Sequence, residues 1–231
     1  MRIIAGEHRG RRLAAPPGQG TRPMLDRVRE AMFSTLGDGI VGARVLDLFA
    51  GTGSLGLEAL SRGAEEALFI ERDPRVVKVL SENVKSLNLE SKALIRASDA
   101  LDPRSWKALG DEPPLVVFLD PPYPFLKDDR RPKVFAAIEA LRKDYLAPGG
   151  RIVFHCPRRQ VDDEHFPDDC VAHERIYGNS ALWYIEPAGD AFYEPELSVD
   201  SIDYGEDDLL VDDFDDEDQL IDMSWVDEDD E

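Results

Sequence analysis

Between residues 43 and 156 the chain alternates apolar runs of strand length with segments of helical period, and this alternation restricts the possible folds more than any other feature. Continuous apolar runs without a polar face are typical of strands that are buried on both sides. Strands that alternate with helices predict a parallel sheet with helices on both faces. The predicted strands span residues 43–49, 67–71, 93–97, 115–120 and 151–156.

The remaining segments add helices between the strands and two smaller elements at the ends. Residues 170–187 have no intervening helix, so they predict an antiparallel hairpin that closes the sheet. The front end predicts two short strands joined by a glycine turn, followed by a helix. The fold class is therefore α/β: a doubly wound, mostly parallel sheet with a C-terminal antiparallel hairpin and a small N-terminal hairpin and helix. The predicted helices span residues 23–37, 56–63, 74–88 and 132–146.

The net charge of −21 is distributed unevenly, and its distribution predicts three regions. Residues 190–231 contain 20 of the 48 acidic residues and none of the 27 basic ones, whereas residues 1–35 contain seven arginines. Basic segments bind anions, and acidic tails are typically solvated. We expect a basic extension over 1–38, a folded domain over 39–187 and a disordered acidic tail over 188–231.

The acidic tail also contains apolar residues, and two further interpretations of it stay open. It could dock onto an unidentified partner, or it could lie across the basic front end of its own chain. The apolar residues available for docking are Phe214, Leu220, Ile221 and Trp225.

Several classes of protein are disfavoured by composition. No stretch approaches the ~18 consecutive apolar residues of a membrane span, and the N-terminus lacks the pattern of a secretory signal. The two cysteines, Cys156 and Cys170, are far apart in the sequence and have no Cys/His cluster beside them. We therefore expect a cytoplasmic protein with no metal site.

A glycine-rich turn follows the first predicted strand and precedes a helix. Gly51, Gly53 and Gly56 match the pattern GxGxxG, and Glu71 ends the next strand. Such glycines let the backbone approach a ligand, and the acidic residue can accept hydrogen bonds from a ribose diol. Taken alone, this pattern also fits an enzyme that binds NAD.

Two carboxylates change that interpretation. Asp47 precedes the glycines, where it would repel a pyrophosphate but would favour an ammonium group. Asp120 begins an Asp-Pro-Pro-Tyr motif after the fourth strand, where prolines cannot continue a ladder and a carboxylate needs a partner. Ligands of doubly wound sheets bind at the carboxyl ends of the strands, so these groups should converge with Glu71. Asp99 would line the same rim, or could serve only as a turn residue.

Together these motifs resemble the S-adenosylmethionine-dependent methyltransferases that modify exocyclic amino groups of nucleobases. The front end resembles more specifically the RsmD-type bacterial 16S ribosomal RNA guanine-N2 methyltransferases, over residues 2–6, 9–11, 21–23 and 26–30. The resemblance covers roughly residues 1–186, and the acidic tail is outside the family pattern. The Asp-Pro-Pro-Tyr motif is shared with DNA adenine methyltransferases, so the front end is the more specific part.

The resemblance implies a Rossmann-like methyltransferase domain and a role for each motif. Its substrate would be small-subunit ribosomal RNA or the assembled small ribosomal subunit. The residues implied to bind S-adenosylmethionine are Asp47, Phe49, Gly51, Gly53, Glu71 and Asp99. The implied catalytic residues are Asp120, Pro121, Pro122 and Tyr123. The arginines expected to contact RNA are Arg9, Arg11, Arg22, Arg27 and Arg29.

The implied chemistry explains the unusual motif. The amino nitrogen of a base is a poor nucleophile because its lone pair is delocalised into the ring. Hydrogen bonds from this group to the Asp120 carboxylate and the Pro121 carbonyl would free that lone pair, and the prolines would hold both acceptors rigidly. Tyr123 would stack on the base, which stabilises such complexes by ~1–3 kcal/mol.

Three alternatives remain open at the level of sequence. The same clamp could methylate adenine N6 in DNA or RNA. The fold could also serve a non-catalytic RNA-binding or assembly protein, and an NAD oxidoreductase would leave the Asp-Pro-Pro-Tyr motif without a role. The aromatic residues Trp106, Phe125 and Trp183 are expected in the core. The histidines show no ligand spacing and are expected to be structural or on the surface: His8, His155, His165 and His173.

Overall fold

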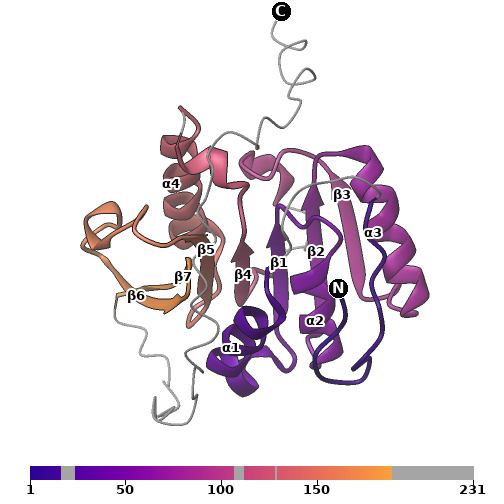
Figure 1. Cartoon of the computed structure of the whole chain (residues 1–231). Coiled ribbons are helices and arrows are strands. Elements are labelled where there is room, and N and C mark those ends of the chain that lie inside the picture. Colours follow the sequence, from indigo (N-terminus) through magenta and orange to yellow (C-terminus); the bar gives the residue numbers. More distant parts are fainter. Residues whose placement is uncertain (17–23, 107–111, 128, 189–231) are drawn as a thin grey trace, which may run out of the picture. The chain divides into compact units, whose positions relative to one another are not determined.

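The protein is built on one seven-stranded sheet with the strand order β3-β2-β1-β4-β5-β7-β6 (Figure 1). The computed structural model describes residues 1–16, 24–106, 112–127 and 129–188. The first five strands are β1 (Arg44–Leu48), β2 (Glu66–Glu71), β3 (Ala93–Ala97), β4 (Val116–Leu119) and β5 (Arg151–Pro157). They pair in parallel, as predicted.

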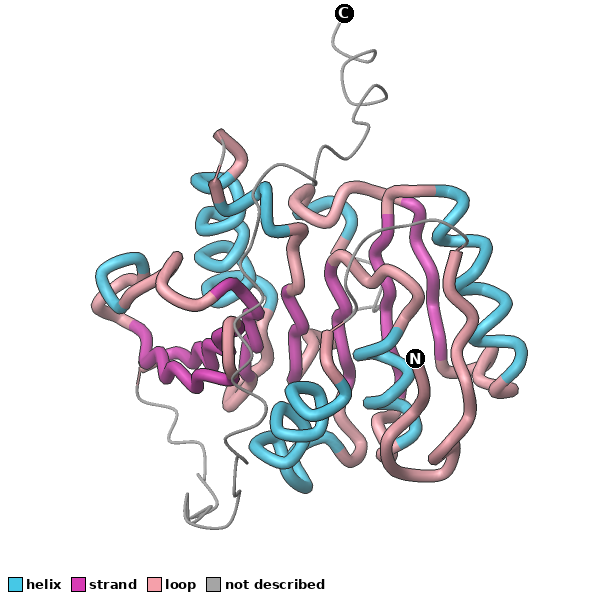
Figure 2. The backbone as a smooth tube through the Cα atoms, in the orientation of Figure 1, coloured by secondary structure: helices cyan, strands magenta, loops and turns pink. Residues whose placement is uncertain are grey.

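The last two strands and the helices complete the sheet and cover it. The C-terminal hairpin consists of β6 (Cys170–Tyr177) and β7 (Ser180–Pro187), and β7 pairs antiparallel with both β5 and β6. Figure 2 shows how helices and strands alternate along the parallel part of the chain. The α-helices are α1 (Asp26–Leu36), α2 (Ser54–Ser61), α3 (Pro74–Ser86) and α4 (Arg131–Ala140). Shorter helical turns span Gly37–Ile40, Pro103–Ser105, Tyr123–Leu126, Leu141–Tyr145 and Asp163–His165.

Two hydrophobic cores cover the two faces of the sheet, which confirms the doubly wound α/β fold. Alternate residues of a strand point to opposite faces, so Val45 packs with α1, α2 and α3, whereas Leu46 packs on the side of α4. Continuous apolar strands are required because both faces are covered. Trp106 and Trp183 belong to the second core, as expected, and Phe125 packs against its margin.

The strand order reverses between β1 and β4. The chain leaves β1 toward β2 on one side and reaches β4 on the other, and both strands run in the same direction. The helices that follow them pack on opposite faces, α2 in the first core and α4 in the second. Doubly wound sheets bind their ligands at the carboxyl ends of two such strands. This is the edge at which the sequence predicts a ligand site.

The front end forms a short antiparallel hairpin, as the sequence predicts. Its two arms meet in a bridge between Arg2 and Arg12, and the N–H groups of Ile3 and Leu13 donate to the carbonyls of Arg11 and Met1 over 2.9 and 3.0 Å. The backbone N–H groups of Ile4 and Ala5 donate to the Glu58 carboxylate of α2, over 2.7 and 3.0 Å. A side chain of the domain thus satisfies backbone groups that the hairpin leaves unpaired.

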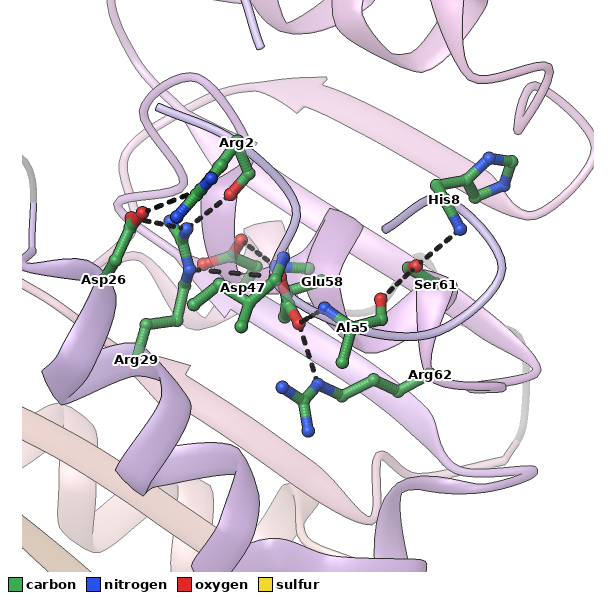
Figure 3. Close-up of polar contacts among 11 residues, drawn as sticks. Arg2, Ala5, His8, Asp26, Arg29, Asp47, Glu58, Ser61 and Arg62 are labelled. Carbon is green, nitrogen blue, oxygen red and sulfur yellow. Dashed lines mark hydrogen bonds and ion pairs between the residues drawn. The ribbon is translucent and has the colours of Figure 1, made fainter. Parts of the chain in front are cut away.

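Glu58 is buried and holds the front end against the domain, as Figure 3 shows. Arg62 donates to its carboxylate over 2.8 Å, and the guanidinium of Arg29 is 3.9 Å away. Arg29 also donates to the Arg2 carbonyl over 2.5 Å and to Asp26 over 2.9 Å. Because ionised groups are costly to bury unpaired, these partners stabilise one another.

The expectation that Arg29 contacts RNA is therefore wrong. Its side chain is 0% exposed, and burial lowers the pKa of its guanidinium against the opposing effect of Glu58 and Asp26. The sequence pattern indicated a basic helix, but Arg29 lies on the buried face of α1 beside Val28. Its role is to join the front end to the core.

The other segment boundaries agree closely with the prediction. Strand β3 and the C-terminal hairpin match their predicted limits, while α4 ends early and its last predicted turn is a π-helical turn, Leu141–Tyr145. The acidic tail lies, apart from Ala188, outside the described residues. No helix in the described ranges is long and apolar enough to cross a membrane.

The contact between Gly6 and α2 provides a test of this arrangement. Gly6 has φ +80°, and a Cβ atom there would be 1.8 Å from the Ser61 carbonyl oxygen. Gly10 has φ +81° and nothing within 4 Å of such an atom. Both alanine variants should lose about 1–2 kcal/mol to left-handed strain. Gly6→Ala should lose at least about 2 kcal/mol more, because backbone has to move.

Urea unfolding of the two variants, measured beside the wild type, checks this expectation. Equal losses for Gly6→Ala and Gly10→Ala would show that the front end is not held against α2 as described.

Candidate active site

The glycine turn between β1 and α2 depends on positive backbone angles. Gly51 and Gly53 have φ values of +54° and +84°, and Phe49 has φ +59° despite its side chain. A non-glycine residue in this region is uncommon and is held there by its surroundings. The Phe49 ring packs edge-on against Phe125, with 5.5 Å between centroids. The turn thus brings backbone N–H groups to the carboxyl edge of the sheet.

Gly56 allows α2 to pack directly on β1. Its N–H donates to the Asp47 carboxylate over 2.8 Å. A Cβ atom at this position would be 2.3 Å from the Phe69 ring and 3.1 Å from the Asp47 carboxylate. The third glycine of the motif therefore serves helix–strand packing.

Asp47 is a buried carboxylate, with 1% of its surface exposed. Burial raises its pKa well above the usual range, the N–H of Gly56 opposes this effect, and the charges of Asp120 and Glu71 add to it. Asp47 therefore resists ionisation, and the negative charge at this edge comes from Glu71 and Asp120. Their charge disfavours a pyrophosphate and favours a cationic ligand, which argues against the NAD interpretation.

Glu71 connects the glycine turn to the next helix. One of its carboxylate oxygens accepts from the Gly51 N–H and the other from the Asp73 N–H, each over 2.9 Å. Asp99 follows β3 and is exposed, and it accepts from the Leu101 N–H over 2.8 Å. By its contacts Asp99 is therefore a turn residue. Its position after a parallel strand also places it at the edge of the sheet where the sequence predicts a ligand.

The Asp-Pro-Pro-Tyr motif begins where β4 ends. The Asp120 N–H donates to the Leu48 carbonyl over 3.5 Å, so the motif starts at the switch point beside β1. Pro121 is buried, and the Pro122 carbonyl accepts from the Phe125 N–H over 2.9 Å in a 3-10 turn that begins at Tyr123. The prolines therefore lead from the strand directly into a tight turn. The Asp120 side chain is 31% exposed, so a ligand at this edge of the sheet can contact it.

His155 is a site residue that the sequence analysis missed. Its Nδ1 atom is 2.8 Å from the Asp120 Oδ1 atom, and its ring lies beside that of Tyr123, with 6.0 Å between centroids. The register explains the contact, because Leu119 pairs with Phe154. A signal was present, because His155 interrupts the apolar run of β5. The prediction lacked the fact that β5 lies next to β4.

Asn83 is a second residue that the motifs did not indicate. This buried side chain of α3 accepts from the Ala14 N–H over 2.7 Å, and donates to the carbonyls of Ala14 and Thr52 over 3.1 and 3.0 Å. It thereby joins the front end to the glycine turn. No local pattern distinguishes such an asparagine from a surface one.

The remaining front-end arginines are exposed where the structure describes them. These are Arg9, Arg11 and Arg27, and Arg22 lies outside the described residues. Arg11 donates to the Ser86 carbonyl over 2.6 Å. Since α3 starts after the carboxyl end of β2 and runs back along the sheet, its last residue, Ser86, lies toward the opposite edge.

Comparison with known proteins places this geometry in a family. A family model described as "Conserved hypothetical protein 95" matches residues 1–186. The chain belongs to this family. Residues 1–186 include the front end, the glycine turn, the Asp-Pro-Pro-Tyr motif and the closing hairpin, so the family match covers the whole of the described fold except its last two residues.

Similar proteins of this kind are known by sequence and by structure. "Putative rRNA methyltransferase YlbH" of Bacillus subtilis is 42% identical over 178 residues, 77% of this chain and 94% of that protein. "Ribosomal RNA small subunit methyltransferase D" of Escherichia coli K12 is 45% identical over 123 residues, 53% of this chain and 60% of that protein. The solved structure of "Putative methyltransferase yhhF" from Escherichia coli has a TM-score of 0.67 and 34% identity, and covers 81% of this chain and 97% of that one.

The burial of Asp47 predicts that the free energy of unfolding of this protein falls as pH rises. Because the pKa of Asp47 is raised in the folded state, its ionisation favours the unfolded chain. This loss of stability begins as pH rises through the ordinary aspartate pKa of about 4 and is complete above the raised value. Asp47→Asn keeps an acceptor for Gly56 and removes the charge, so it should be increasingly more stable than the wild type as pH rises.

Urea unfolding at a series of pH values checks this, with the exposed Asp99→Asn as the matched control. A difference between Asp47→Asn and the wild type that stays constant with pH would contradict it.

Proposed function

We propose that the protein is an S-adenosylmethionine-dependent methyltransferase that methylates the exocyclic N2 amino group of a guanine in small-subunit ribosomal RNA. The observation that carries this proposal is the Asp-Pro-Pro-Tyr motif beside the glycine turn at the switch point. Relatives named as ribosomal RNA methyltransferases support the substrate class. The family resemblance of the front end supports the guanine N2 position.

The residues at this edge fit S-adenosylmethionine. Its ribose hydroxyls can donate to Glu71, which is partly exposed, and its adenine amino group can donate to Asp99. The turn at Gly51 and Gly53 lets the ligand approach the backbone. Asp47 and its acidic neighbours favour the two positive charges of the cofactor. When bound, the cofactor supplies a methyl group on a sulfonium centre.

The clamp would act on the amino group of the base. The Asp120 carboxylate and the Pro121 carbonyl accept hydrogen bonds from this group, which directs its lone pair toward the incoming methyl group. The turn after Pro122 fixes both acceptors, and accurate positioning provides much of the rate. Tyr123 stacks on the base and holds it beside Asp120.

The alternatives are less well supported. Methylation of adenine N6 would use the same clamp, but the relatives are named for ribosomal RNA. A non-catalytic RNA-binding or assembly protein would not need a partly exposed Asp120 at this edge. The RNA backbone would be held by exposed arginines such as Arg9, Arg11 and Arg27, so binding should weaken steeply with salt. We place this activity in the cytoplasm, with the small ribosomal subunit or its RNA as partner.

Transfer of labelled methyl groups from S-adenosylmethionine tests this function. Unmodified small ribosomal subunits, naked ribosomal RNA and DNA are offered separately, and the modified nucleosides are identified after digestion. We expect N2-methylguanosine, with Asp120→Ala slower by about 10²–10³-fold because a preorganised hydrogen-bonding group is lost. The matched control is Glu139→Ala, which should keep full activity. It removes an exposed carboxylate of α4 that pairs with Lys143.

The outcomes separate the candidates. N6-methyladenine would retain the clamp and reject the guanine substrate. Binding of S-adenosylmethionine without transfer to any of the three would favour the non-catalytic alternative.

The acidic tail allows a second test of how RNA binds. Removal of residues 190–231 changes the net charge from −21 to −1. If the tail competes with RNA for the basic front end, the truncated protein should bind RNA more tightly at low salt, and the difference should shrink as salt screens it. Filter binding across a salt series measures both. Unchanged affinity at low salt would reject the competition and leave the partner-docking alternative.

A further inference from the structure

We propose that His155 is a positioning residue for Asp120, which orients the carboxylate that accepts from the substrate amino group. This inference rests on the proposed function, because it assigns a role within the same clamp. It concerns a side chain that no motif indicated and that the register of β4 and β5 brings to the site.

The hydrogen bond has one possible direction when Asp120 is ionised. A carboxylate only accepts, so the Nδ1 atom of His155 has to carry the proton. The bond of 2.8 Å goes to the Oδ1 atom of Asp120, which leaves Oδ2 to accept from the base. His155 is 5% exposed, so the bond is shielded from competing water and is stronger than it would be at the surface.

Asp120 needs such a partner because of its place in the chain. It is the first residue beyond β4, and the torsion that turns its carboxylate has broad minima. Rotation about that bond would move the acceptor away from the amino group. His155, by contrast, lies within β5, where it pairs with Leu182 of β7 and directly follows Phe154, the partner of Leu119 in β4. A rigid donor thus fixes a flexible acceptor.

The imidazole also lies beside the second member of the clamp. Its ring is 6.0 Å from that of Tyr123, at an interplanar angle of 61°. A single side chain therefore borders both the carboxylate that would polarise the base and the ring that would stack on it. Displacement of His155 would disturb both contacts together.

The cost of this histidine argues for a function. Its Nε2 atom is buried and has no hydrogen-bond partner within the part of the chain that the structure describes. The neighbouring residues Val153, Phe154 and Cys156 are apolar and buried. An aliphatic residue would pack in this strand without an unsatisfied nitrogen, since a buried unpaired polar group costs about 1–3 kcal/mol. The hydrogen bond to Asp120 is the interaction that offsets this cost.

Two substitutions separate positioning from packing. His155→Asn keeps an N–H donor on the atom that corresponds to Nδ1, and His155→Leu keeps most of the volume without a donor. We expect kcat to fall about 10²-fold in His155→Leu, as for other small misplacements of catalytic groups, with little change in the KM for RNA. His155→Asn should recover most of kcat. Equal kcat values in the two variants, at matched thermal stability, would overturn the proposal.

A spectroscopic measurement tests the pair without any turnover. The Nδ1–H proton of His155 should give a low-field NMR signal in the wild type, identified by its loss in His155→Asn. It should disappear or move upfield in Asp120→Ala, whose partly exposed site tolerates truncation. A wild-type spectrum without this signal, or a signal unchanged in Asp120→Ala, would overturn the pairing. If the wild type gives this NMR signal but transfers no methyl group, the proposed function is rejected and the pairing of His155 with Asp120 is established.

Discussion

The buried carboxylate of Glu58 is the group on which the arrangement of front end and site depends. It accepts from two backbone N–H groups of the front end and from Arg62, and it lies close to Arg29. Removing one member of such a group leaves an unpaired buried charge, which typically destabilises a protein by about 3–5 kcal/mol. Glu58 belongs to α2, the helix that the glycine turn begins. The same helix therefore anchors the basic segment and presents the turn.

Most of the fold could be predicted because strands that are buried on both faces require continuous apolar runs, which the sequence shows directly. The apolar runs at β1 to β5 and the hairpin from Cys170 to Pro187 lie close to where the pattern places them. The hairpin of the front end could be predicted too, but its attachment to the domain could not. The partner of Ile4 and Ala5 is a side chain 53 or 54 residues away. Local pattern cannot identify a partner of that kind.

The residues of the site also differ in whether the sequence could predict them. Asp47, Glu71 and Asp120 could be brought together from sequence, because one topological rule places the carboxyl ends of parallel strands at one edge. His155 and Asn83 could not, because each acts through a neighbour that only the strand order or the packing of the front end supplies. Arg29 shows the opposite error. Its charge indicated the surface, but the helix face on which it lies is turned inward.

The charge of the site restricts how a nucleic acid can approach it. Asp47, Glu71 and Asp120 act on one another electrostatically, so this edge repels phosphate while it favours a cationic cofactor. Exposed arginines surround these carboxylates, because Arg72 follows β2, and Arg158 and Arg159 follow β5. A nucleic-acid substrate would therefore place its backbone on such arginines and extend a single base toward Asp120. Such a base has to come from a loop or be flipped out of its helix, because the amino group of a stacked base cannot reach the Asp120 carboxylate.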